Sequence, residues 1–195
     1  MDGREMYMPA CVDGRGCGKI IRQTDHVFAW RETMKLASTA FSNGASIPLK
    51  HTGDGQDLSP PLSWSGAPAE AKSFALICDD PDAPSPKRPA AEPWVHWVIF
   101  NIPADRLVLP EGVQRAPEPG ELPGVRQGRN SWPKNHLGYR GPAPPPASGK
   151  HRYFFKIYAL DAMLALHGGA TKQELLKAMS GCILDEAQTY GTYER

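Results

Sequence analysis

Three side chains that could do chemistry lie at the ends of apolar segments of this chain. Asp80 stands directly before Pro81, and a proline pushes the preceding residue toward an extended conformation, so this carboxylate is held in a rigid loop. His96 is the one polar residue in the apolar run 94–100, and His151 begins a later segment rich in aromatic residues. Asp80 and His96 are 16 residues apart, and His96 and His151 are 55 residues apart. These separations do not decide between an anion pocket, a metal site and a hydrolytic site.

The first interpretation is a pocket for a small anion. Tyr153 lies two residues after His151, so both side chains point to the same face of a strand. A protonated imidazole, a phenol and a backbone N–H all donate to phosphate or carboxylate oxygens. Glycine lets such an amide approach a ligand closely, as at Gly141 before Pro142. Asp80 would then orient an imidazole or accept from a protonated ligand.

Two other interpretations use the same side chains. Two histidines and one carboxylate match the ligand set of a metal facial triad. An Asp–His pair could also assist hydrolysis, although the sequence shows no nucleophile elbow and no Ser or Cys in a recognisable catalytic setting. Purely structural roles are available too: His96 as a core histidine bonded to backbone, His151 as a surface histidine at a strand end, and Tyr153 as core packing.

The composition limits the class of protein. A length of 195 residues suggests one domain, and a net charge of +1 gives no electrostatic support for binding nucleic acid. No apolar run approaches the length of a membrane span. The four cysteines lack the spacing of a zinc site, so we expect free thiols, a reducing compartment and a cytoplasmic location.

The apolar pattern predicts a mainly β protein. Thr171 and Glu174 form a capping box that begins a helix, whose apolar stripe should continue to a stop near Gly191. We therefore expect an antiparallel β-sandwich with peripheral helices, including one near the C-terminus. Alternating or continuous apolar residues predict the strands, which are 36–41, 62–64, 74–78, 94–102 and 151–161.

Two segments depart from this pattern. Residues 1–33 show no apolar period, so we expect a disordered extension before a domain at 34–195. Residues 103–150 are rich in proline and show little periodicity. A loop of this length inside a domain is usually functional or disordered, and Trp132 and Tyr139 could anchor it, so we favour a functional loop.

Four motifs follow one another along the chain. They are D-P-D-A-P (80–84), W-V-H-W-V-I-F-N-I-P (94–103), G-Y-R-G-P-A-P-P (138–145) and H-R-Y-F-F-K-I-Y-A-L-D (151–161). Together they resemble the phosphatidylethanolamine-binding proteins, and most closely the bacterial Raf kinase inhibitor-like branch of that family. The resemblance extends over residues 34–195.

The resemblance implies a β-sandwich with a small anion pocket, without catalytic turnover, metal or cofactor. Its ligands would be simple anions or phosphate-bearing head groups. A kinase or protease as protein partner and a homodimer are further expectations, as are cis bonds before Pro84 and Pro93. The motifs assign the pocket residues as Asp80, Trp94, His96, Gly141, Pro142, His151 and Tyr153.

The sequence also predicts how binding depends on pH. The apolar neighbours of His96 should disfavour its charged form, whereas a nearby Asp80 and a bound anion should favour it. We expect phosphate ligands to bind more tightly as the pH falls from about 8 to 6, because His96 would gain a proton there.

Removal of residues 1–33 should leave the melting temperature almost unchanged, because an extension without packed contacts contributes little to stability. Thermal unfolding of the full chain and of a chain that starts at Met34, followed by circular dichroism, measures the difference. A drop of more than about 3 °C, roughly 1 kcal/mol for a domain of this size, would show that the extension is part of the folded domain.

Overall fold

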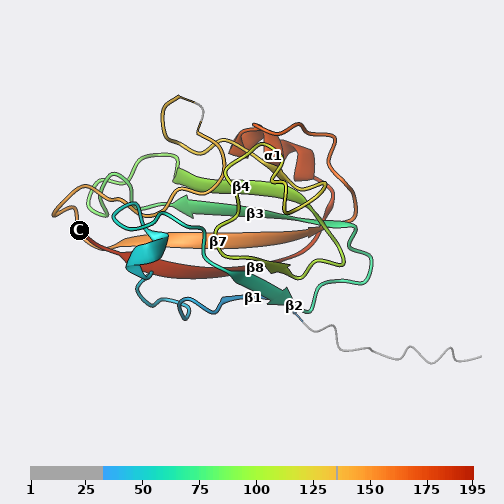
Figure 1. Ribbon diagram of the computed structural model, residues 1–195, viewed down its shortest axis with the longest axis horizontal. Helices are drawn as coiled ribbons and strands as arrows, with labels where there is room; N and C mark the ends of the chain where they lie inside the picture. Colours follow the sequence, from blue (N-terminus) through green and yellow to red (C-terminus); the bar gives the residue numbers. More distant parts are fainter. Residues whose placement is uncertain (1–32, 135) are drawn as a thin grey trace, which may run out of the picture. The chain divides into compact units, whose positions relative to one another are not determined.

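The computed structural model describes residues 33–134 and 136–195, which form two antiparallel β-sheets and one α-helix (Figure 1). The expected mainly β fold is confirmed, while the expectation for residues 1–32 lies outside the described residues. The larger sheet has the strand order β6-β4-β3-β7-β8 and the smaller one β1-β2-β5. The elements are β1 (Lys35–Ser38), the 3-10 helix η1 (Leu49–His51), β2 (Leu62–Ser65), β3 (Ser73–Asp80), β4 (Trp94–Pro103), β5 (Val108–Leu109), β6 (Arg126–Gln127), β7 (His151–Leu160), α1 (Lys172–Met179) and β8 (Ile183–Tyr193).

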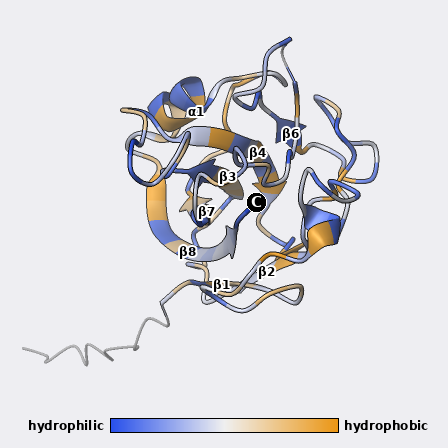
Figure 2. Ribbon diagram, turned by 90° about the vertical axis from the view of Figure 1, so that its left-hand side faces the viewer, coloured by the Kyte–Doolittle hydropathy of each residue, from blue (hydrophilic) through white to orange (hydrophobic). Residues whose placement is uncertain are grey.

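The larger sheet is covered on both faces. One face packs against the smaller sheet, where Trp64 of β2 meets Phe74 of β3 edge-on at 5.2 Å between ring centroids. The other face packs against α1 through Leu175 and Met179. Figure 2 shows α1 and the pair β1–β2 on opposite sides of this sheet. A strand buried on both faces is apolar throughout, which explains the continuous apolar runs in β3 and β4.

Strand alternation decides which face each functional residue reaches. Phe74, Leu76 and Cys78 of β3 belong to the core between the sheets, whereas Ala75 and Ile77 face α1. The two aspartates that end β3 therefore point to opposite faces. On β7, the predicted alternation is confirmed, since residues 151, 153, 155 and 157 are all buried.

The C-terminal helix is much shorter than predicted. Its capping box is present: Thr171 Oγ1 accepts from the N–H of Glu174 at 3.2 Å, and Glu174 Oε2 accepts from the N–H of Thr171 at 2.7 Å. The helix ends at Met179, and Gly181 adopts a φ of +84° that turns the chain. The residues predicted to continue the helix form β8, which pairs with β7 along its length. The prediction was wrong because this long-range pairing outweighs a local apolar spacing that also fits a strand.

The other local expectations had mixed outcomes. The bond between Ala83 and Pro84 is cis as predicted, but the bond between Glu92 and Pro93 is not. A proline lowers the preference for trans to about 0.5–1 kcal/mol without choosing the isomer, so the sequence could not settle this point.

The loop anchor Tyr139 is buried, and its hydroxyl donates to a carbonyl of η1 at 2.7 Å.

Two further findings concern the cysteines and membrane-spanning helices. Cys78 and Cys182 are free thiols, as expected, while Cys11 and Cys17 lie outside the described residues. Within the described part of the chain, no helix has the length and apolar character needed to cross a membrane.

A bulge in β4 places Asn101 in the left-handed region, with a φ of 57°. Between Phe74 and Leu76 the pairing of β3 with β4 shifts, so that β4 holds one extra residue. Asparagine tolerates this backbone conformation better than most residues. Its buried amide also closes two bonds with the main chain of Leu164: Oδ1 accepts at 2.8 Å and Nδ2 donates at 3.0 Å.

Asn101→Ala should lower the free energy of unfolding by about 2–4 kcal/mol, because two buried backbone groups lose their partners and alanine is strained at a positive φ. Asn101→Gly is the matched control, since it loses the same hydrogen bonds but accepts the backbone conformation. It should be more stable than Asn101→Ala by about 1 kcal/mol in urea denaturation. Losses below about 0.5 kcal/mol in both variants would contradict the role of the amide.

Candidate functional site

A pocket of about 380 Å³ lies where the end of β3 meets the starts of β4 and β7. Both strands run antiparallel to β3, so their first residues lie beside its last ones. This topology brings together five of the predicted site residues from three distant parts of the sequence. The lining consists of Asp80, Ala83, Pro84, Ala90, Glu92, Trp94, His96, Trp132, Ala143, Pro144, Pro145, His151 and Tyr153.

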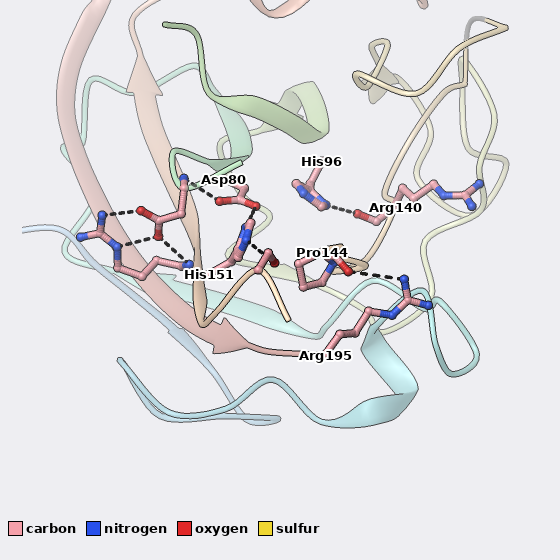
Figure 3. A network of polar contacts seen from close by, with 9 residues as sticks. Asp80, His96, Arg140, Pro144, His151 and Arg195 are labelled. Atoms are coloured by element: carbon pink, nitrogen blue, oxygen red, sulfur yellow. Dashed lines mark hydrogen bonds and ion pairs between the residues drawn. The ribbon is translucent and has the colours of Figure 1, made fainter. Parts of the chain in front are cut away.

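Asp80 and His151 form a buried pair at the floor of this site (Figure 3). Nδ1 of His151 donates to Oδ2 of Asp80 at 2.7 Å, and Nε2 of His151 lies 3.1 Å from Oγ of Ser148. Burial raises the pKa of Asp80, and the hydrogen bond from His151 partly offsets this rise. Both ring nitrogens of His151 therefore have hydrogen-bond partners. The ring lines the pocket but has no nitrogen left to bind a ligand.

A second anchor holds the loop after β3. Arg152, on the outer face of β7, donates to the carboxylate of Asp82 from Nε at 2.9 Å and from Nη2 at 2.8 Å. The backbone N–H of Arg152 also donates to Asp82 at 2.9 Å. The hydrogen bonds from the Arg152 side chain lower the pKa of Asp82. Asp80 also accepts from the N–H of Asp82 at 2.8 Å, so hydrogen bonds hold the loop at both Asp80 and Asp82.

His96 is buried and neutral in the free protein. Its Nδ1 lies 2.5 Å from the carbonyl oxygen of Arg140 (Figure 3). A carbonyl only accepts, so Nδ1 carries the proton and Nε2 of the neutral ring holds a lone pair. Burial lowers the pKa of His96 to about 4, and the bond to Arg140 raises it too little to compensate. The expectation that His96 gains a proton between pH 8 and 6 is therefore wrong for the free protein, because the effect of burial outweighs the groups that raise the pKa.

Tyr153 carries an unused polar group at the pocket. Its side chain is 1% exposed, yet its hydroxyl has no hydrogen-bond partner among the described residues. Burial raises the pKa of Tyr153 well above its ordinary value, so the group remains a phenol. The ring lies edge-on to His96 at 5.0 Å and stacks on His151 at 6.4 Å between centroids. A buried hydroxyl without a partner is costly, and it is thus a donor available to a ligand.

Trp132 and Trp94 form an aromatic side of the pocket. Trp94 is 39% exposed and lies edge-on to Trp132, with ring centroids 5.5 Å apart. Trp132 also contacts the ring of His96 at 4.9 Å, and the guanidinium of Arg140 lies 5.3 Å from its centroid. Trp94 was assigned to the pocket from its motif, whereas Trp132 was expected only to anchor its loop.

Gly141 and Pro142 support the pocket wall and are not part of its lining. The N–H of Gly141, expected to face a ligand, donates to Oδ1 of Asp57 at 2.6 Å. A Cβ at Gly141 would lie 2.3 Å from a carbonyl oxygen of η1, so glycine is needed there for packing. The carbonyl of Pro142 accepts from the N–H of Gly53 at 2.7 Å. The wall itself is formed by the next residues of the chain, 143–145.

Ser148 is the functional candidate that the sequence analysis missed. It lies in a proline-rich loop three residues before His151 and shows no motif, and a local turn brings its hydroxyl to the ring of His151. Among the described residues, no group of three or more His, Cys, Asp or Glu side chains is placed to hold a metal ion.

Comparisons with known proteins agree with this fold over most of the chain. A family model described as phosphatidylethanolamine-binding protein matches residues 37–194. A UPF0098 protein of Methanothermobacter thermautotrophicus is 53% identical over 163 residues, which cover 83% of this chain and 99% of the relative. The crystal structure of a putative phosphatidylethanolamine-binding protein homologue from Chlamydia trachomatis is 42% identical, with a TM-score of 0.72 and coverage of 84% of this chain and 98% of that one. E. coli YbcL is 29% identical, with a TM-score of 0.73 and coverage of 84% and 99%. The chain belongs to the phosphatidylethanolamine-binding protein family.

Proposed function

We propose that the chain is a binding protein whose pocket holds the phosphate group of a small phosphate monoester, such as phosphoethanolamine, without turning it over. The observation that carries this proposal is a donor and an acceptor for which no hydrogen-bond partner is found among the described residues. The hydroxyl of Tyr153 can donate, and Nε2 of His96 can accept, from two rings whose centroids are 5.0 Å apart. A singly protonated phosphate offers the complement, an oxygen that accepts and a P–OH that donates.

The charges of the pocket favour a phosphate with a single negative charge. Its lining contains the carboxyl groups of Asp80 and Glu92 and, among the described residues, no lysine or arginine. The charge of Asp80 is engaged with His151. A phosphate dianion would meet these acidic groups without a compensating cation, whereas a monoanion with one acidic hydrogen can donate to His96. The site therefore selects a protonation state by hydrogen bonding more than by charge.

The apolar walls suit the organic part of such a ligand. Pro84, Trp94, Trp132 and Pro144 supply flat carbon surfaces around the polar groups. A volume of about 380 Å³ lies at the small end of the range for ligand pockets, so the pocket suits a head group better than a whole lipid. The name of the matching family, which refers to phosphatidylethanolamine, supports a phosphate-bearing ligand, although the phosphate of that lipid is a diester and has no P–OH to donate to His96. Regulation of a kinase or protease, a homodimer and a cytoplasmic location stay predictions.

Tyr153→Phe should separate binding from stability. It removes the donor that meets the phosphate, so the affinity for phosphoethanolamine should fall by about 10–100-fold, the value of a hydrogen bond to a charged group. The free protein should keep or raise its melting temperature, because the lost hydroxyl has no partner there. Calorimetry and thermal unfolding measure the two effects. Tyr158→Phe, on the opposite face of β7, is the matched control and should leave the affinity unchanged; a loss of stability without loss of affinity in Tyr153→Phe would contradict the proposal.

The pH dependence should follow the ligand. The second ionisation of a phosphate monoester lies near pH 6, so the monoanion fraction rises about 50-fold between pH 8 and 6. The affinity for phosphoethanolamine should rise by a similar factor, whereas glycerophosphoethanolamine, a diester with no ionisation in this range, should bind equally at both pH values. His96, with a pKa of about 4, adds nothing above pH 6. Calorimetry of the two ligands is the test, and an equal rise for the diester would show that a protein group titrates instead.

A further inference from the structure

Ser148 completes a row of three side chains that phosphate binding does not use. Its Oγ lies 3.1 Å from Nε2 of His151, whose Nδ1 lies 2.7 Å from Oδ2 of Asp80. A hydroxyl, an imidazole and a carboxylate joined in this order are the groups with which serine hydrolases activate their nucleophile. We propose that Ser148 is a nucleophile that small carboxylic esters acylate, with His151 as its general base. This activity goes beyond the proposed binding function and does not depend on it.

The hydrogen bonds give His151 the tautomer that a general base needs. Asp80 Oδ2 accepts the proton on Nδ1, which leaves the lone pair of Nε2 directed at the hydroxyl of Ser148. The two partners are 0% and 3% exposed, for His151 and Asp80 respectively. Their orientation is therefore fixed by packing, and the carboxylate stabilises the imidazolium that forms when the ring takes a proton.

The backbone around Ser148 is held in an uncommon conformation on both sides. Ala147 has a φ of 59° and Gly149 a φ of 102°. A non-glycine residue at a positive φ costs on the order of 1 kcal/mol, and such residues cluster at functional sites. The N–H of Ser148 donates to the carbonyl of Pro145 at 3.1 Å, and that of Ala147 to the carbonyl of Arg195 at 3.1 Å. These bonds hold a sharp turn that presents the hydroxyl to His151.

The same turn offers a donor for the negative charge that develops on an ester oxygen. Gly149 follows Ser148 directly, and its N–H has no hydrogen-bond partner among the described residues. In many serine hydrolases the amide after the nucleophile is one of the two donors that stabilise this oxyanion. Ser148 and Gly149 are both partly exposed, so a small ester can reach them. Pro144, Pro145 and His151 line the adjoining pocket, whose apolar walls suit a short acyl group.

The reaction balances with water as the only co-reactant. Oγ of Ser148 attacks the carbonyl carbon while its proton passes to Nε2 of His151; the C–O bond to the alcohol then breaks, and the alcohol leaves with that proton. Water next attacks the acyl carbon and gives a proton to Nε2. The C–O bond to Ser148 breaks, and Oγ takes this proton as the carboxylic acid leaves.

A fluorophosphonate probe, which phosphonylates activated serines, and p-nitrophenyl acetate test the proposal on the full chain. Intact mass spectrometry should show one added group, peptide mapping should place it on Ser148, and p-nitrophenolate should be released. Ser148→Ala should abolish both signals. Ser85→Ala is the matched control, because Ser85 is also partly exposed but has no bond to an imidazole, and this variant should react like the parent chain.

Asp80→Asn tests the carboxylate separately from the hydroxyl. It should slow acylation by about 10²–10⁴-fold, because an amide neither enforces the tautomer nor stabilises the imidazolium. Thermal unfolding ensures that the variant is compared below its melting temperature. If the probe leaves the parent chain unlabelled, or labels Ser148 equally fast in folded Asp80→Asn, the hydroxyl of Ser148 serves only to pair with the ring of His151 and the proposal is overturned.

Discussion

The hydrogen-bonded pair of Asp80 and His151 is the interaction on which the rest of the site depends. It joins the last residue of β3 to the first residue of β7, and both side chains are almost inaccessible to water. Removing the imidazole would leave a buried carboxylate without its hydrogen-bond donor, which typically costs about 1–3 kcal/mol and more for a charged group. Asp80 is hydrogen-bonded to His151, so neither His96 nor the hydroxyl of Tyr153 is paired with this carboxylate among the described residues. The hydrogen-bonding groups that remain for a ligand in the pocket thus depend on the partner of Asp80.

The neighbouring residues Asp79 and Asp80 have different roles, one structural and one at the pocket. Asp79 is 1% exposed and points to the opposite face of the sheet, where its oxygens lie 2.6 Å from Nζ of Lys172 and 3.1 Å from Nζ of Lys156. It therefore ties α1 to the sheet, while Asp80 builds the pocket. A slip of one residue in the register of β3 would move every side chain of the strand to the other face, so Asp79 and Asp80 would both lose these partners. The bulge at Asn101 and the anchor on Asp82 help to fix that register.

The sequence predicted strands β1, β2, β3, β4 and β7 and the proximity of Asp80, His96, His151 and Tyr153, because apolar runs and strand alternation are local signals and the motifs resemble a known family. It predicted no strand in the proline-rich segment that holds the two-residue strands β5 and β6. It did not predict β8, since its apolar spacing fits a helix as well as a strand and only pairing with β7 decides. The pKa of His96 was also misjudged, because burial lowers it and Asp80, which was expected to raise it, pairs with His151. Ser148 was missed although it lies only three residues before His151, because no motif marks the turn that brings the two side chains together.

Hydrogen bonding and charge make different demands on a pocket of this kind. A cluster of lysines or arginines attracts any phosphate and holds a dianion best, but a neutral acceptor and a neutral donor distinguish a protonated phosphate from a fully ionised one. His96 can act as that acceptor only while it is uncharged, and burial in an apolar strand keeps it so. The apolar run that first made this histidine look like a core residue is therefore the feature that fits it for binding. Burial and function are here two consequences of the same placement.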